Sequence, residues 1–287
     1  MSEELKALIQ DYRDGRISRR EFVLKSFRIA GGVAAAGALF GCAVGGEAAG
    51  ERSEVQLIAA NVEFKGKGGP ISGYLARPGT RQSPGVVVTH ANQGINEYTR
   101  DVARRLARAG YAALAVDFLS RQGGTAKVNP KGEGLGNIRE LAPWQKVAED
   151  SAAACEYLRS LSYVRGDRLG TVGFCWGGEM TFSSATEVRG LSAVVVFYGR
   201  SPKPLDRVRT IEAPVLAHYG EKDPGVDQDI PGTVEAMKKY GKSYTYKIYP
   251  GAQHGFHTET SDRYHPEAAK EAWARTLDFF QANLQRA

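Results

Sequence analysis

The sequence predicts one doubly wound α/β domain, with a mostly parallel sheet that opens on an antiparallel hairpin. Three observations support this fold class. From about residue 55 onward, short β-branched runs alternate with longer amphipathic segments, as in strands joined by helices. The run Gly85–Thr89 is continuously apolar, which is typical of a strand buried on both faces of a parallel sheet. No internal repeat or low-complexity linker divides the 287 residues, a length that a single α/β domain reaches.

The opening hairpin is predicted over Gln56–Phe64 and Ile71–Ala76, joined by the glycine-rich turn Gly66–Gly69. After the buried strand, helical spacing predicts a helix over Asn96–Ala109 that ends at Gly110. The later elements alternate in the same way. Strands are predicted at Tyr111–Val116, Arg168–Gly173, Ser192–Tyr198, Pro214–Tyr219 and Tyr244–Tyr249, and helices at Trp144–Leu161, Met180–Ala185, Thr233–Tyr240 and Pro266–Asn283.

The segment Ser120–Arg139, rich in Gly, Asn and Lys, is predicted to be a long loop. It would lie at the carboxyl ends of the strands, where folds of this class bind their ligands. A binding site is therefore expected at that edge of the sheet.

Charge and cysteine content exclude several classes of protein. The net charge of +6 is spread along the chain without a clustered basic face or a matching motif, so no nucleic-acid partner is predicted. Three cysteines cannot build a disulfide framework, and no CxxC or Cys/His metal spacing is present. No run of about 18 apolar residues occurs, which argues against a conventional transmembrane helix.

Residues 1–50 are predicted to be an export signal and linker, separate from a domain over residues 51–287. Ser18–Lys25 reads SRREFVLK and resembles the twin-arginine export motif, and the Ala/Gly-rich apolar segment Ile29–Phe40 follows it. The alternative is a basic amphipathic helix that packs on the domain. Because twin-arginine signals export folded proteins, we expect the export machinery as a partner and a periplasmic or envelope-attached location in a bacterium.

How the exported chain would be processed is left open by the sequence. Leu39-Phe40-Gly41-Cys42 looks like a lipoprotein processing site, which would place a lipid anchor on Cys42. Cleavage near Ala48 or Ala49 is the competing outcome, and it would release the domain.

A candidate nucleophile lies in Gly173–Gly178, which reads GFCWGG between a predicted strand and a predicted helix. This is the G-x-S-x-G strand–turn–helix motif with cysteine in place of serine. Its geometry would raise the Cys175 sulfur above the sheet and aim the backbone N–H of Trp176 at an incoming carbonyl oxygen. The alternative is a buried cysteine in a glycine-rich turn.

Two further residues complete a predicted catalytic triad. Asp223 lies in Gly220–Pro224, which directly follows the strand Pro214–Tyr219, and His254 lies shortly after the strand Tyr244–Tyr249. The order nucleophile, acid, histidine is that of α/β-hydrolases, in which the histidine exchanges protons with the nucleophile and the acid orients it. Asp227 is the second candidate for the acid. Cys155 lies among alanines in a predicted helix and is expected to be a packing residue.

From about residue 70 to its end, the chain resembles the dienelactone hydrolase family. The cysteine motif, GEKDP around Asp223, QHGF around His254 and the closing ARTLDFF helix match in order, as does His90–Asn96, read as HANQGIN. The resemblance implies hydrolysis of a small ester or lactone through an acyl-enzyme, with no metal and no organic cofactor. It also implies that the backbone N–H of Asn92 is the second oxyanion donor, beside that of Trp176.

Two positions depart from the family pattern. Ala91 stands where the family has a glutamate that controls ionisation of the cysteine. The family holds a substrate carboxylate with two arginines. Arg121 matches the first, which makes it a candidate substrate-binding residue, and Thr258 stands at the position of the second. The alternative for Arg121 is a solvated arginine in a loop.

The expected function is therefore a carboxylic ester hydrolase that acts on a small ester or lactone. A broad carboxylesterase or thioesterase is one alternative, and a non-catalytic binding protein on a hydrolase scaffold is another. A thiol-dependent redox protein fits less well, because no resolving cysteine neighbours Cys175.

Overall fold

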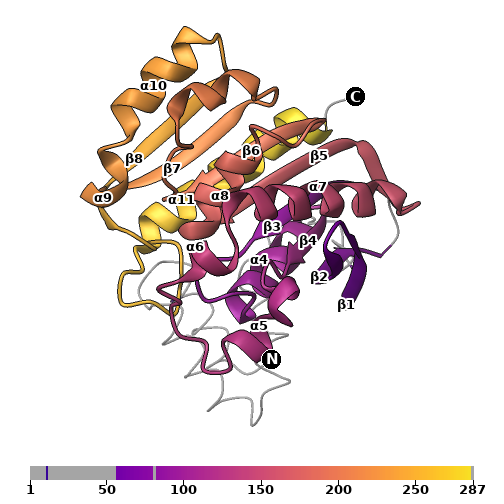
Figure 1. The fold of residues 1–287 in the computed structure, drawn as a ribbon. Coiled ribbons are helices and arrows are strands. Elements are labelled where there is room, and N and C mark those ends of the chain that lie inside the picture. The colour runs from indigo at the N-terminus through magenta and orange to yellow at the C-terminus, as the bar shows by residue number, and fades with distance from the viewer. Residues whose placement is uncertain (1–10, 12–55, 80–81, 286–287) are drawn as a thin grey trace. The chain divides into compact units, whose positions relative to one another are not determined.

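The computed structural model describes residue 11 and residues 56–79 and 82–285, and the chain divides into two compact units, Met1–Glu54 and Val55–Ala287. The motif Ser18–Lys25 and Cys42 lie outside the described residues. The second unit carries the fold (Figure 1). In the part of the chain that the structure describes, no helix is both long and apolar enough to cross a membrane.

The second unit is built on one eight-stranded sheet with the order β1-β2-β4-β3-β5-β6-β7-β8. Its first two strands form an antiparallel hairpin, β2 also pairs antiparallel with β4, and all later pairs are parallel. The predicted fold class is thus confirmed. The strands are β1 Leu57–Gly66, β2 Gly69–Pro78, β3 Ser83–Thr89, β4 Ala112–Val116, β5 Val164–Phe174, β6 Leu191–Phe197, β7 Val215–Lys222 and β8 Tyr244–Gln253.

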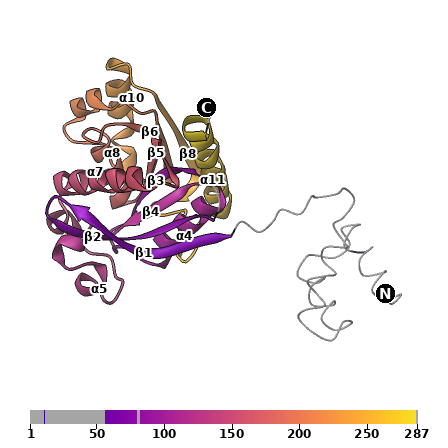
Figure 2. The same cartoon turned by 90° about the vertical axis from the view of Figure 1, so that its right-hand side faces the viewer.

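Helices cover both faces of this sheet, as Figures 1 and 2 show. α4 and α11 pack on one face, and α7, α8 and α10 pack on the other. Short helices and turns connect the remaining elements. The helices are α4 Glu97–Arg108, α5 Thr125–Val128, α6 Ile138–Leu141, α7 Trp144–Ser160, α8 Trp176–Ser184, α9 Pro224–Asp227, α10 Ile230–Lys239 and α11 Pro266–Phe280, with 3-10 turns η1 Ser120–Gln122 and η2 Leu205–Thr210 and the π-helix η3 Gln281–Gln285.

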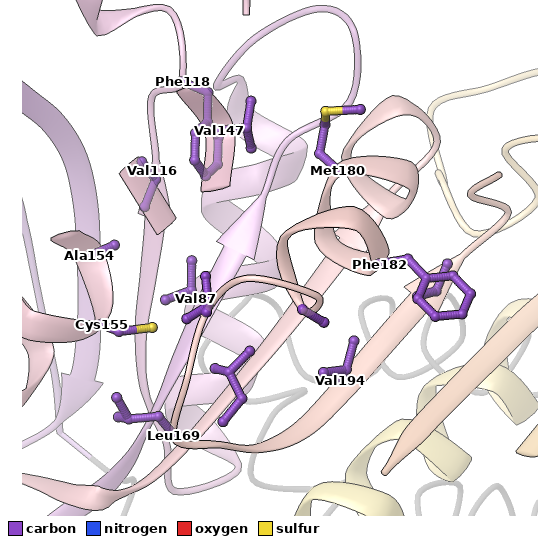
Figure 3. Close-up of a cluster of buried hydrophobic side chains, with 14 of the residues drawn as sticks. Val87, Val116, Phe118, Val147, Ala154, Cys155, Leu169, Met180, Phe182 and Val194 are labelled. Atoms are coloured by element: carbon purple, nitrogen blue, oxygen red, sulfur yellow. The ribbon is translucent and has the colours of Figure 1, made fainter. Parts of the chain in front are cut away.

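Each face of the sheet has its own hydrophobic core, because successive side chains of a strand point to opposite faces. All seven residues of β3 are buried; Val87 faces the core under α7 and α8, while Val86 and Val88 face the core under α4 and α11. Figure 3 shows the first of these cores, where Cys155 of α7 packs near Ala154 and Val87. Cys155 is therefore the packing residue that the sequence predicts.

The segment Ser120–Arg139 is not the continuous loop that the sequence predicts. It contains η1, α5 and the first residues of α6. The buried carboxylate of Asp117 fixes its start, because it accepts hydrogen bonds from the backbone N–H and the hydroxyl of Thr125, both at 2.7 Å. The Asn129 amide holds its middle by donating to the carbonyls of Gln93 and Glu133. A few long-range hydrogen bonds thus order a segment whose composition is typical of a loop.

α8 packs unusually closely on the sheet. A Cβ atom on Gly177 would lie 2.2 Å from the carbonyl oxygen of His90 and 2.6 Å from that of Thr89. Both are backbone atoms at the end of β3, so neither can rotate away. The first turn of α8 can therefore lie against this strand end only with glycine at position 177.

We expect Gly177→Ala to destabilise the protein, although alanine within a helix is normally more stable than glycine by about 1 kcal/mol. Overpacking costs about 1–3 kcal/mol, and a clash with rigid backbone lies at the upper end of that range. Urea denaturation should show a lower free energy of unfolding for Gly177→Ala than for the wild type. Gly136→Ala is the matched control, since an added Cβ meets no atom within 4 Å there. Equal stability of the two variants would contradict the interpretation.

Candidate active site

Cys175 lies in the sharp turn between β5 and α8. Its backbone has φ 57° and ψ −120°, a conformation that non-glycine residues rarely adopt. Its N–H donates to the carbonyl of Phe197 at the end of β6 (3.0 Å), and its own carbonyl accepts from the N–H of Glu179 (3.1 Å). Bonds on both sides hold the strained turn in place, as is common at functional sites. The turn presents the thiol at the carboxyl edge of the sheet.

The structure brings the three predicted triad residues together. His254 directly follows β8, and its Nε2 lies 2.9 Å from the Sγ of Cys175. Asp223 directly follows β7, and its Oδ2 lies 2.6 Å from the Nδ1 of His254. The three side chains thus form a continuous chain of hydrogen bonds between the ends of three strands.

The surroundings of His254 favour its protonated form. Burial on its own would lower its pKa, but the hydrogen bonds to Asp223 and Cys175 and the attraction to both groups raise the pKa to about 9. An imidazole with this pKa can hold a proton at neutral pH and release it to a stronger base. The site is therefore equipped for proton transfer at the thiol.

Asp227, the second candidate for the acid, lies in α9 and donates its N–H to the carbonyl of Asp223 (2.9 Å). No hydrogen bond joins Asp227 to His254 among the described residues. Burial and the negative charge of Asp223 raise the pKa of Asp227 to about 6. Asp223 is the carboxylate that holds the imidazole.

The two predicted oxyanion donors, Trp176 and Asn92, both line the same pocket as the thiol. Trp176 is the first residue of α8, where a backbone N–H has no partner within the helix and the helix dipole favours negative charge. Asn92 belongs to the loop after β3. His90 was not among the predicted site residues, but it supports this loop: its Nδ1 lies 2.7 Å from the carbonyl oxygen of Ala91, and its ring stacks on the Trp176 indole at 5.4 Å.

The pocket beside the thiol has a volume of about 360 Å³. Apolar side chains form part of its wall, and three charged residues that were not predicted from the sequence also line it: Arg139, Glu179 and Arg200. Arg139 of α6 pairs with Glu179 of α8 at 2.5 Å, which ties α6 to the helix that begins beside Cys175. Glu179 lies one helical turn after the cysteine, and this spacing is the sequence signal that could have identified it.

Arg121 does not occupy the position predicted for a substrate-binding residue. Its guanidinium donates to both carboxylate oxygens of the buried Asp150, at 2.6 and 3.1 Å, and to Glu149 at 3.2 Å. It is not among the residues that line the pocket beside Cys175. Two carboxylates on α7 hold Arg121, and the prediction is corrected accordingly: here the residue fixes η1 to α7.

Cys155 is more deeply buried than Cys175. It is buried in α7, and burial raises the pKa of its thiol to about 12.

Within residues 56–79 and 82–285, no cluster of three His, Cys, Asp or Glu side chains could hold a metal ion.

Comparison with known proteins agrees with the fold. Residues 71–284 match the dienelactone hydrolase family. The chain is 38% identical over 223 residues to a Bradyrhizobium protein named "Probable 2-oxo-3-(5-oxofuran-2-ylidene)propanoate lactonase", covering 74% of this chain and 89% of the relative. It is 34% identical over 240 residues to a Methylorubrum extorquens "Putative carboxymethylenebutenolidase", covering 78% and 81% of the two chains.

Among solved structures, a "Putative Dienelactone Hydrolase" from Klebsiella pneumoniae subsp. pneumoniae superposes with a TM-score of 0.72 at 29% identity. The match covers 78% of this chain and 98% of that one. Sequence and structure therefore lead to the same assignment. The chain belongs to the dienelactone hydrolase family and is a carboxylic ester hydrolase.

Proposed function

We propose that this protein hydrolyses a small ester or lactone through a Cys175–His254–Asp223 triad and an acyl-enzyme intermediate. The observation that carries the proposal is the pair of contacts made by one imidazole, 2.9 Å to the Cys175 sulfur and 2.6 Å to the Asp223 carboxylate. A nucleophile, a base and a group that orients the base are the minimal set for such a reaction.

In the first half of the reaction, the sulfur of Cys175 attacks the ester carbonyl carbon while His254 Nε2 holds the thiol proton. The carbonyl π electrons move to oxygen, and the backbone N–H groups of Trp176 and Asn92 donate to the resulting oxyanion. Collapse of this intermediate breaks the C–O bond of the ester. The leaving alkoxide takes the proton from His254, which leaves a thioester on Cys175.

In the second half, His254 accepts a proton from a water molecule that attacks the thioester carbonyl. The C–S bond breaks, the carboxylic acid leaves, and the proton returns to the Cys175–His254 pair. Asp223 holds the imidazole in the tautomer that both halves require and stabilises its charged form.

Two other functions compete with this proposal. A broad carboxylesterase or thioesterase would use the same residues and differ only in its substrate profile. Ala91 in place of the family glutamate suggests a non-catalytic binding protein. A binding function, however, does not explain why the imidazole of His254 lies between a thiol and a carboxylate. Turnover of aryl esters, thioesters and lactones by the purified chain separates the three.

We also propose that the protein is exported in folded form by the twin-arginine route and works in the periplasm or attached to the envelope. The support is the sequence SRREFVLK over Ser18–Lys25 and the apolar segment that follows it. Cys42 is a candidate for lipid attachment. Both features lie outside the described residues, so their test is made in cells.

Replacing Cys175 with alanine should lower kcat for an aryl ester at least about 10³-fold and leave the Tm nearly unchanged, because only the nucleophile is lost. His254→Ala should be almost as damaging, and the double variant no worse than either, since members of such a triad act as a unit. Cys155→Ala is the matched control, in which the other described cysteine is removed and activity is retained. Wild-type turnover by Cys175→Ala would refute the mechanism.

Asp223→Asn should bring the pKa of His254 down from about 9 toward its ordinary 6.5, because the bond and the attraction to the carboxylate are lost. NMR titration of the imidazole measures this directly. Since the folded pKa lies above the unfolded one, protonated His254 stabilises the fold below pH 6.5, and this contribution fades as the pH rises to about 9. The difference in the free energy of unfolding between wild type and His254→Gln should therefore decrease from pH 6.5 to about pH 9.

Replacing Arg19 and Arg20 with lysines keeps the charge but should leave the protein in the cytoplasm, because the twin-arginine signal is a receptor-read address. Cell fractionation followed by immunoblotting reads the outcome. Lys25→Arg, which changes a single basic residue outside the arginine pair, is the control. Unchanged export of the double-lysine variant would show that another route operates.

A further inference from the structure

Tyr198 is a pocket-lining residue with a strained backbone and no part in the chemistry described above. It directly follows β6, and its φ of 39° lies in the left-handed region that bulky side chains avoid. Such strain costs about 1–3 kcal/mol and persists only where the surroundings over-determine it. Tyr198 lines the pocket, and strained residues of this kind are common at functional sites.

The backbone around Tyr198 is fixed from two sides. Its own N–H donates to the carbonyl of His218 in β7 at 2.7 Å, and the preceding Phe197 accepts the N–H of Cys175. The following Gly199 lies against α8, since a Cβ there would come within 2.3 Å of the Gly178 carbonyl carbon. The position of the Tyr198 ring is therefore set by the same turn that presents the thiol.

The ring of Tyr198 lies against the imidazole of His254, with 5.1 Å between the ring centroids. The rest of the tyrosine ring packs on Phe256, Phe174 and Phe197. The residue is only 1% exposed, so a bound substrate can touch little of it. Its ring therefore contacts mainly protein side chains, among them His254.

His254 needs such support because of where it lies. It follows the edge strand β8 and precedes Gly255, which has φ 83°, so no helix or paired strand fixes its backbone. Hydrogen bonds to Asp223 and Cys175 set the direction of the imidazole, but both lie in the plane of the ring. They do not fix the tilt of the ring about the line that joins the two partners. The contact with the Tyr198 ring, whose plane makes an angle of 59° with that of the imidazole, limits this tilt.

Resting on the proposed triad, we propose that Tyr198 is a positioning residue that holds the imidazole of His254 at the tilt at which it reaches Cys175 and Asp223 together. The ring performs this role and the hydroxyl does not. The hydroxyl is buried near Tyr98 and Thr258, but no hydrogen bond of normal geometry reaches it.

The test separates the ring from the hydroxyl and from the backbone. Tyr198→Phe keeps the ring and should keep kcat and KM within about twofold. Tyr198→Leu and Tyr198→Asn remove the ring, and we expect kcat to fall about 10- to 100-fold, as misplacement of a catalytic group by about 1 Å can cause. Because Tyr198 is almost fully buried, KM should change by less than about threefold. Asparagine tolerates a positive φ, so this variant keeps the test valid where leucine does not fold.

Tyr111→Leu is the matched control for lost stability. Tyr111 is also 1% exposed, and its ring packs on Phe280 in the core under α11. The Tyr111→Leu variant should lose stability as Tyr198→Leu does, but its kcat should stay unchanged. Unchanged kcat in both Tyr198→Asn and Tyr198→Leu, or an equal fall in Tyr198→Phe, would overturn the proposal. Absence of ester hydrolysis in the wild type would instead contradict the proposed function, so the two failures are distinguishable.

Discussion

The strained backbone of Cys175 is the constraint on which the rest of this site depends. Strand β5 must turn into α8 within a single residue, and this is possible only where strand and helix almost touch. Gly173 and Gly177 allow it, because a side chain at either would collide with backbone oxygen at 2.1 or 2.2 Å. The same close approach places the start of α8, with its Trp176 N–H, beside the loop that carries Asn92. Nucleophile and predicted oxyanion donors are thus positioned by one packing contact.

The other half of the triad comes from the part of the sheet beyond β6. Asp223 and His254 follow β7 and β8, and parallel pairing brings the carboxyl ends of these strands to the edge where β5 ends. Asp223 is buried at the start of α9, whereas His254 lies in a connection flanked by glycines. The less constrained partner, His254, is the one that exchanges protons in the proposed reaction. Its placement depends on side-chain contacts from elements that are themselves fixed.

Much of this arrangement could be predicted from sequence, because it follows from local signals and strand order. GFCWGG between a strand and a helix identifies Cys175, and the position directly after a strand identifies Asp223 and His254. Arg121 shows the limit of that reasoning. Its match to the first of the family's two carboxylate-binding arginines suggested substrate binding, but two carboxylates of α7, separated from it by 28 and 29 residues, hold its guanidinium. Long-range pairings of this kind, like the one between Arg139 and Glu179, leave no periodic or spacing signal that identifies which two residues pair.

Ala91 replaces a glutamate of the family pattern, but other charged side chains line the pocket. The loop after β3 contributes no carboxylate at that position, yet Glu179 brings one to the pocket from α8, where Arg139 neutralises it. Arg200 adds a positive charge from the segment after β6. Apart from Asp223 and His254, the charged side chains that line the pocket therefore come from α6, α8 and the segment after β6 rather than from the β3 loop and η1. Since α6 lies in the segment between β4 and α7, the part of the chain least predictable from sequence supplies much of the polar wall around the thiol.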